Sequence, residues 1–433
     1  MKNISFSKIF NLYQIDKIGL NCFHIGLLFL ASSAFISAIF LLFSLIISSS
    51  HRFNVYLHDK WNYPLLIAAF LMVLGCFRAY SGWLAWIGLV NWIPFFWCFW
   101  GFQPYLLSVD NRRKASLLLL AGSVPVVVTG LGQVWLGWSG PWVALNGLII
   151  WFVAPGGQPL GRLSGLFNYA NITGAWLAFV WPIALAFLLQ PSLNWVKRGV
   201  AFLFGMSICI ALILTNSRNA WGGMVLSIPF VLGSATWFWL IPLLFTLLLP
   251  VVFAVLPIVP FELQLFARKI VPEGIWTRLA DISLSSNGSR PLETTRIFQW
   301  KEAINLFFQK PWFGYGAAAF SIIYPLRQGI WHGHAHNLPL ELVVAHGLPV
   351  AILLVSMILV LLIISFKKCF LTVYHDRQSV FDRAWWAATF TLVFLHASDM
   401  PMFDSRINLA GWIFLSGLRC LITPKAPKPS FDD

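Results

Sequence analysis

Eleven apolar stretches of this 433-residue chain are long enough to cross a bilayer, and this feature constrains the fold more than any other. A hydrocarbon core about 30 Å thick requires about 20 apolar residues in a helix. Only 10% of the residues are charged, against about 25% in soluble domains, which excludes a soluble fold. The stretches are 24–48, 61–77, 83–106, 115–131, 171–189, 199–215, 220–235, 237–258, 348–366, 384–398 and 407–422. We therefore predict an all-α polytopic membrane protein with about 11 (10–12) transmembrane helices.

Two further segments bear on the number of helices. The apolar segment 142–154 is short and ends in Pro155-Gly156-Gly157, which favours a re-entrant or interfacial segment over a twelfth helix. The first apolar stretch follows Lys17 and lacks a small-residue cleavage site, so we interpret it as a retained helix. The six cysteines lie in or beside apolar spans and predict neither disulfides nor a CxxC metal site.

The distribution of Lys and Arg between alternate short loops predicts orientation, because cytoplasmic loops hold the excess. One side holds Arg52, Lys60, Arg112, Arg113, Lys114, Lys197, Arg198, Lys367, Lys368, Arg377, Arg383, Lys425 and Lys428. The other side holds Lys2, Lys8, Lys17, Arg78, Arg162, Arg218 and Arg406. The first side is predicted to be cytoplasmic, which places the N-terminus outside and the C-terminus inside.

The same assignment divides the chain into four parts. We expect an N-terminal membrane bundle of about eight helices over 1–258, a long non-cytoplasmic loop over 259–347, about three helices over 348–422, and a cytoplasmic tail over 423–433. Charged residues at the outer ends of the helices could then share one site with the long loop.

The formal net charge of +14 does not indicate a nucleic-acid partner. The Lys and Arg residues are scattered singly between apolar spans and form no dense basic patch with interleaved aromatic residues. The excess suits orientation in the bilayer and contact with membrane lipids or phosphate groups.

The long loop is expected to contain short helices. A helix is predicted from about Thr294 to Phe308, because apolar residues recur there at helical spacing. The recurring residues are Ile297, Trp300, Ile304 and Phe307. This apolar stripe is expected to lie on the bundle or on the membrane surface.

Three histidines, His332, His334 and His336, follow at alternate positions. An extended segment would point them to one face as metal ligands, although no nearby Cys or acid completes a shell. A histidine acting as general base needs no such shell, and its pKa near neutrality suits removing a proton from a sugar hydroxyl. Interfacial histidines without a role are the remaining alternative.

Several motifs over about 160–410 resemble those of the O-antigen ligase and polymerase superfamily, bacterial membrane proteins that act on glycans carried by undecaprenyl diphosphate. The motifs are Arg162-Leu-Ser-Gly165-Leu-Phe-Asn-Tyr-Ala-Asn171, Thr215-Asn-Ser-Arg218-Asn-Ala-Trp-Gly222, Arg296, Pro311-Trp-Phe-Gly314-Tyr-Gly316, and His336-Asn337 with Gly347 ten residues beyond. Their order and spacing carry the resemblance. One position departs from the ligase pattern, because Val350 stands where a small or hydroxylated residue is usual, which weakens ligase relative to polymerase.

The resemblance implies that His336 is the catalytic base and that Arg162 and Arg218 bind the diphosphate. Guanidinium groups stabilise the charge that develops on a diphosphate leaving group without a metal. Further candidate substrate-binding residues are Asn171, Arg296, Asn337, Asp399 and Arg406. Asp399 and Arg406 could instead pair with each other, and Glu341 is expected to point to another helix face than His336.

Together with these residues, the resemblance implies a metal-independent, cofactor-free, inverting transferase in a bacterial inner membrane, with the long loop periplasmic. The resemblance further implies that it moves an undecaprenyl-diphosphate-linked glycan to a lipid or glycan acceptor. The rival is a transporter of bicarbonate or another small anion, since the superfamily also includes inorganic-carbon transport proteins. Transporters usually place their site near the bilayer midplane on broken helices, whereas the charged residues here lie at helix ends, which favours the enzyme. A scaffold without catalysis is the third possibility.

Overall fold

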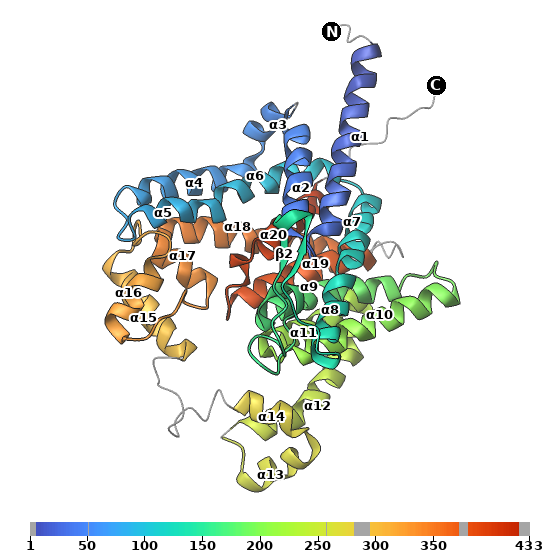
Figure 1. Ribbon diagram of the computed structural model, residues 1–433, viewed down its shortest axis with the longest axis vertical. Helices are drawn as coiled ribbons and strands as arrows, with labels where there is room; N and C mark the ends of the chain where they lie inside the picture. Colours follow the sequence, from blue (N-terminus) through green and yellow to red (C-terminus); the bar gives the residue numbers. More distant parts are fainter. Residues whose placement is uncertain (1–5, 51, 257, 281–294, 372–379, 424–433) are drawn as a thin grey trace.

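The computed structural model describes residues 6–50, 52–256, 258–280, 295–371 and 380–423, and the architecture of these residues is all-α apart from one small β-hairpin (Figure 1). The first half contains α1 (Phe6–Phe29), α2 (Ala34–Ser50), α3 (Phe53–His58), α4 (Tyr63–Cys76), α5 (Trp83–Gly88), α6 (Ile93–Gly101), α7 (Val109–Gly122), α8 (Val124–Trp135), β1 (Trp142–Ala144), β2 (Ile149–Trp151), α9 (Ala170–Leu188) and α10 (Trp195–Leu214). The second half contains α11 (Arg218–Leu232), α12 (Trp237–Val255), α13 (Phe261–Ile270), α14 (Glu273–Ala280), α15 (Arg296–Gln309), α16 (Ala319–Gln328), α17 (Leu338–His346), α18 (Leu348–Phe366), α19 (Val380–His396) and α20 (Ser405–Ile422).

The predicted fold class is confirmed. Among the described residues, six helical segments are long and apolar enough to cross a membrane, and two shorter apolar helices accompany them. The six are Trp83–Gly101, Val109–Trp135, Ala170–Leu188, Trp195–Leu214, Ser234–Val255 and Leu348–Leu371, and the shorter two are Ala34–Ser50 and Lys60–Cys76. The chain is therefore a polytopic helical membrane protein.

Helix α9 forms the centre of the bundle and packs against α10, α11 and α19. Small residues make this packing close, as is usual between membrane helices. A Cβ at Gly174 of α9 would lie 3.0 Å from the Ser217 side chain, and a Cβ at Gly223 of α11 would lie 2.9 Å from Thr391 of α19. The start of α9 therefore lies beside the start of α11 and the end of α19.

The prediction of a single first span over 24–48 is wrong. The chain turns between α1 and α2, which pack against each other as a hairpin (Figure 1). The Ser33 hydroxyl accepts a hydrogen bond from Ile36 N at 3.3 Å and so caps the start of α2. Asp16 pairs with Arg52 at 3.1 Å, so Lys17 and Arg52 lie at the same end of the hairpin. The charge count placed Lys17 opposite Arg52, and this grouping is wrong, because the extra turn places Lys17 at the end of the bundle that carries Arg52, called the basic end below.

The short apolar segment 142–154 is not a membrane helix. It forms the antiparallel hairpin of β1 and β2, in which Trp142 is paired with Trp151. Leu145 and Asn146 in the connection have positive φ values of 50° and 53°, as a tight hairpin turn requires. The Trp151 indole donates a hydrogen bond to Ser32 O at 2.5 Å, which ties the hairpin to the α1–α2 turn.

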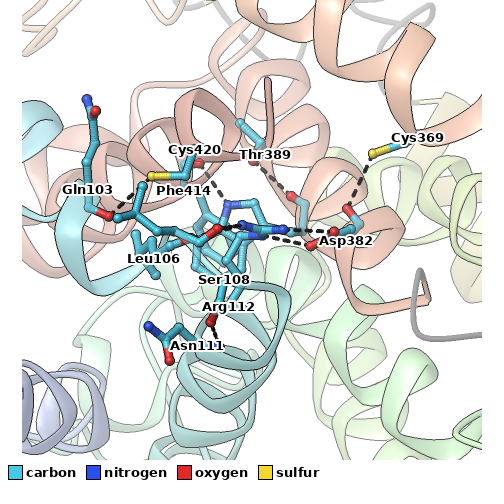
Figure 2. Close-up of polar contacts among 12 residues, drawn as sticks. Gln103, Leu106, Ser108, Asn111, Arg112, Cys369, Asp382, Thr389, Phe414 and Cys420 are labelled. Atoms are coloured by element: carbon cyan, nitrogen blue, oxygen red, sulfur yellow. Dashed lines mark hydrogen bonds and ion pairs between the residues drawn. The ribbon is translucent and has the colours of Figure 1, made fainter. Parts of the chain in front are cut away.

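A buried ion pair joins α7 to α19 at the basic end of the bundle (Figure 2). Arg112 is 4% exposed, and its Nε and Nη2 donate to the two carboxylate oxygens of Asp382 at 2.7 and 2.9 Å. Its Nη1 donates to the carbonyls of Leu106 and Leu107 at 2.9 and 3.0 Å. Because the guanidinium has carboxylate and carbonyl partners, the pair tolerates burial.

In the long loop, the predicted helix near 294–308 is present as α15. Phe307 packs against the bundle core, whereas Ile297 is 70% exposed and Ile304 is 42% exposed, so contact of these two with the membrane surface stays a prediction. Gln299, Glu302, Ala303 and Leu306 are buried instead. The stretch Ser285–Ser289 and the tail from residue 424 lie outside the described residues.

Candidate functional site

His336 lies in a short connection whose backbone is held at three neighbouring positions. Ala335 N donates to the Glu341 carboxylate at 2.9 Å, and His336 N donates to His334 Nδ1 at 3.2 Å. The Asn337 side chain accepts from Leu340 N at 3.0 Å, which caps α17, and donates to Ala397 O at 2.8 Å. These bonds fix His336 at a φ of 52°, which a non-glycine residue adopts rarely.

The side chain of His336 meets an acidic residue from the turn between α19 and α20. Nδ1 of His336 lies 3.0 Å from Oδ1 of Asp399, and the His336 side chain is 25% exposed. Oδ1 of Asp399 also accepts a hydrogen bond from Met400 N at 2.9 Å. A histidine that is oriented by a buried carboxylate through one ring nitrogen is a recurring arrangement for a general base.

Two further residues surround the Asp399 carboxylate. Arg296, at the start of α15, approaches Oδ2 to 3.5 Å and is 37% exposed. Asn171, in the first turn of α9, donates to the same oxygen at 3.4 Å. Burial opposes the charged form, but the hydrogen bond from His336 and the charges of His336 and Arg296 outweigh it and lower the pKa of Asp399 to about 2. Asp399 is therefore an anion at neutral pH.

Arg162 connects to this cluster through Asn171. Its Nη2 donates to Asn171 Oδ1 at 2.5 Å, and its Nε donates to Thr215 O at 2.7 Å. The segment that carries Arg162 is fixed by Gln133 of α8, whose side chain accepts from Ser164 N at 3.0 Å. Arg162, Asn171, Asp399, Arg296 and His336 thus form one continuous polar network.

Arg218 lies at the first position of α11, immediately after the segment that Arg162 holds. Asn216 has a φ of 50°, so the chain turns sharply between α10 and α11. The Asn219 amide donates to Leu395 O at 2.9 Å and fixes the start of α11 to the end of α19. Arg218 therefore lies at the same end of the bundle as the network.

The predicted pair of Asp399 and Arg406 is wrong. Arg406 pairs instead with Asp404 through two hydrogen bonds, at 2.9 and 2.6 Å. It also donates to Leu166 O at 3.0 Å and lies 3.8 Å from the centroid of the Phe167 ring. Arg406 therefore anchors the start of α20, and the carboxylate of Asp399 pairs with His336 instead.

The histidine segment does not present three aligned side chains. His334, His336 and Asp399 each offer a ligand atom within 4.8 Å of one another, so the acid that no neighbouring residue supplied comes from the distant turn. His332 is not part of this group. Burial, with the charge of His336, lowers the pKa of His334 to about 3, and His334 Nδ1 already accepts the His336 N–H. Two imidazole nitrogens and one carboxylate oxygen are ligands that a small divalent ion accepts.

Glu341 holds the backbone of the histidine segment, a role that the sequence did not indicate. His336 precedes α17 and lies on no helix face, and the chain folds back there so that the Glu341 carboxylate accepts a hydrogen bond from Ala335 N–H. Glu341 is 7% exposed, and burial raises its pKa to about 7. The signal in the sequence was an acidic residue five positions after His336. Its role as acceptor for the backbone of the histidine segment follows only from the structure.

Residues 203–355 of the chain match the family model described as O-antigen ligase. The match confirms the resemblance over this segment, which includes Arg218, Arg296 and His336. Arg162 and Asp399 lie outside the matched segment and join the site through the contacts described above. No curated protein matches the chain.

Proposed function

We infer that this relative of the O-antigen ligases transfers a glycan from a membrane lipid diphosphate to an acceptor hydroxyl. The observation that carries the proposal is the His336–Asp399 pair at 3.0 Å, whose carboxylate is also approached by Arg296 and is linked to Arg162 through Asn171. Undecaprenyl diphosphate is the proposed carrier, and the bacterial inner membrane is the proposed location.

His336 is proposed to remove the proton from the acceptor hydroxyl. When Nδ1–H is donated to Asp399, the lone pair of Nε2 is directed away from the carboxylate and is available as the base. Within the described residues, Nε2 of His336 has no hydrogen-bond partner. The Asp399 anion stabilises the imidazolium that forms as the proton arrives.

Arg162 and Arg218 are proposed to hold the diphosphate, with Arg296 beside the Asp399 carboxylate. The bond from the acceptor oxygen to the anomeric carbon forms while the bond from that carbon to the diphosphate oxygen breaks. Guanidinium groups stabilise the negative charge that the leaving diphosphate gains, and the start of α11 adds the positive end of a helix dipole. A single displacement of this kind inverts the configuration at the anomeric carbon.

The basic end of the bundle supports a non-cytoplasmic position for the site. The basic end lies opposite the site. When Lys17 is counted there with Arg52, this end holds a larger excess of Lys and Arg than in the predicted topology. By the distribution of charges, that end is cytoplasmic, and the site then opens to the periplasm.

The mechanism needs no metal, and this is testable because His334, His336 and Asp399 could hold one. We expect a chelator such as EDTA to leave transfer by the purified protein unchanged. Loss of activity with EDTA and its return with Zn²⁺ would contradict the base mechanism.

The main test is His336→Ala and Arg218→Ala in the native host, with His58→Ala as the control. His58 is an exposed histidine of α3 near the basic end, bonded to Asn54 O at 2.7 Å. Surface polysaccharide is read by gel, alongside bicarbonate uptake. We expect both site variants to lose the product and the control to keep it. Unchanged polysaccharide with lost uptake would overturn the proposal in favour of transport.

The glycan that accumulates in the His336→Ala host separates the two enzyme types. A ligase defect leaves finished polymer on the carrier lipid, whereas a polymerase defect leaves single repeat units.

A further inference from the structure

A cavity of about 420 Å³ lies beside the polar network that contains His336. None of the residues of that network lines the cavity. It is formed by the α1–α2 turn, strand β2, the segment after Leu166 and the start of α20. The Trp151 hydrogen bond to Ser32 O joins two of its walls. Its volume is within the range of ligand-binding pockets, about 300–1,000 Å³.

The cavity reaches toward His336 through Phe403. Phe403 lines the cavity, and its ring centroid lies 5.3 Å from that of His334. The His334 ring in turn lies 4.2 Å from the His336 ring. A chain of sugar units with one end at His336 could therefore extend into the cavity.

The lining combines aromatic faces with uncharged polar groups. Phe35, Phe152 and Phe403 line the cavity and are 43%, 56% and 48% exposed. The Asn168 amide and the Ser405 hydroxyl also line it, and neither side chain forms a hydrogen bond within the described part of the chain. Aromatic faces suit the C–H face of a sugar ring, and free amide and hydroxyl groups suit its hydroxyl edge.

The charges of the lining argue against other ligands. Arg406 is the cationic side chain of the lining. It already donates to Asp404 and to the carbonyls of Leu166 and Ala31, so it is not available to a phosphate. A lipid tail would leave the Asn168 amide and the Ser405 hydroxyl without hydrogen-bond partners, which is costly. The lining therefore fits a neutral, hydroxyl-rich ligand.

We propose that this cavity binds neutral sugar units of the glycan, next to the unit that reacts at His336. The inference rests on the proposed transfer reaction and names a subsite for it. The sugars could belong to the lipid-linked donor or to a glycan acceptor, which share this chemistry.

The test measures binding in a His336→Ala background, where no turnover occurs, with the protein in nanodiscs. The probes are the lipid-diphosphate-linked glycan fraction of the host membranes, the glycan released from it by mild acid, and the glycolipid acceptor fraction. Two variants alter the cavity: Phe403→Leu and Asn168→Gly, of which the second keeps the positive φ of 60°. Phe313→Leu is the matched control, because Phe313 is 49% exposed and does not line the cavity.

We expect each cavity variant to weaken binding of one glycan fraction about tenfold, while the control binds as the parent does. If a cavity variant weakens binding of the lipid-linked glycan and of the released glycan that competes with it, the cavity binds the donor. If it weakens binding of the glycolipid acceptor, the cavity binds the acceptor. Unchanged binding of all three probes would overturn the inference. That outcome is independent of the transfer reaction, which the loss of product in the host tests by itself.

Discussion

Replacing Asp399 by Asn tests how the site creates a base. The pKa of Asp399 falls from 3.8 to about 2, because its bonds and charges outweigh burial. That net shift corresponds to about 2 kcal/mol, by which the interactions with His336, Arg296 and the Met400 amide exceed the cost of burial. If most of it acts on the imidazolium, kcat falls by roughly 30-fold. An amide also favours the wrong tautomer of the histidine, and this effect alone reaches about 10⁴-fold in a protease triad.

The assay is transfer by the purified protein at saturating donor and acceptor, so that kcat is measured separately from KM. Asp59→Asn is the control, because Asp59 is similarly exposed at 16%, pairs with Arg419 rather than with His336, and does not line the cavity. We expect Asp59→Asn to lower the thermal midpoint but to keep kcat within about threefold. A kcat for Asp399→Asn within about threefold of the parent would refute the base mechanism.

Three further predictions concern stability. Gly347→Ala should destabilise the protein by more than about 1 kcal/mol, because φ is 84° and a Cβ would collide with the Trp312 carbonyl, whereas Gly205→Ala meets nothing within 4 Å and should not destabilise; thermal unfolding distinguishes them. Burial raises the pKa of Glu341 from 4.5 to about 7, so the folded state binds the extra proton and stability should fall as pH rises from about 4.5 to 7; Glu341→Gln should remove that slope in thermal unfolding from pH 5 to 8. Arg112→Met leaves the half-buried Asp382 carboxylate without its partner and should cost up to about 3 kcal/mol, measured as a lower unfolding midpoint; an unchanged midpoint would contradict the role of the pair.

Membrane residence and helix positions were predictable from the sequence, because long apolar stretches have no other stable environment than lipid. The starts and ends of α9, α10 and α18 lie within a few residues of the predicted stretches. The turn between α1 and α2 was missed, because Ser32 and Ser33 interrupt an otherwise continuous apolar run without a charge or a proline. Hydropathy measures transfer to lipid and does not register a turn that is satisfied by local hydrogen bonds.

The candidate site was likewise predictable from the sequence only in part. The sequence alone identified His336 and the arginines as candidates, since polar residues at membrane helix ends are costly and their types suit proton transfer and phosphate binding. Only the tertiary structure decided that Asp399 belongs to His336 and not to Arg406, because the Asn337 bond to Ala397 O holds the start of α17 against the end of α19. Partners 63 residues apart are set by how helices cross, and no local pattern encodes that crossing.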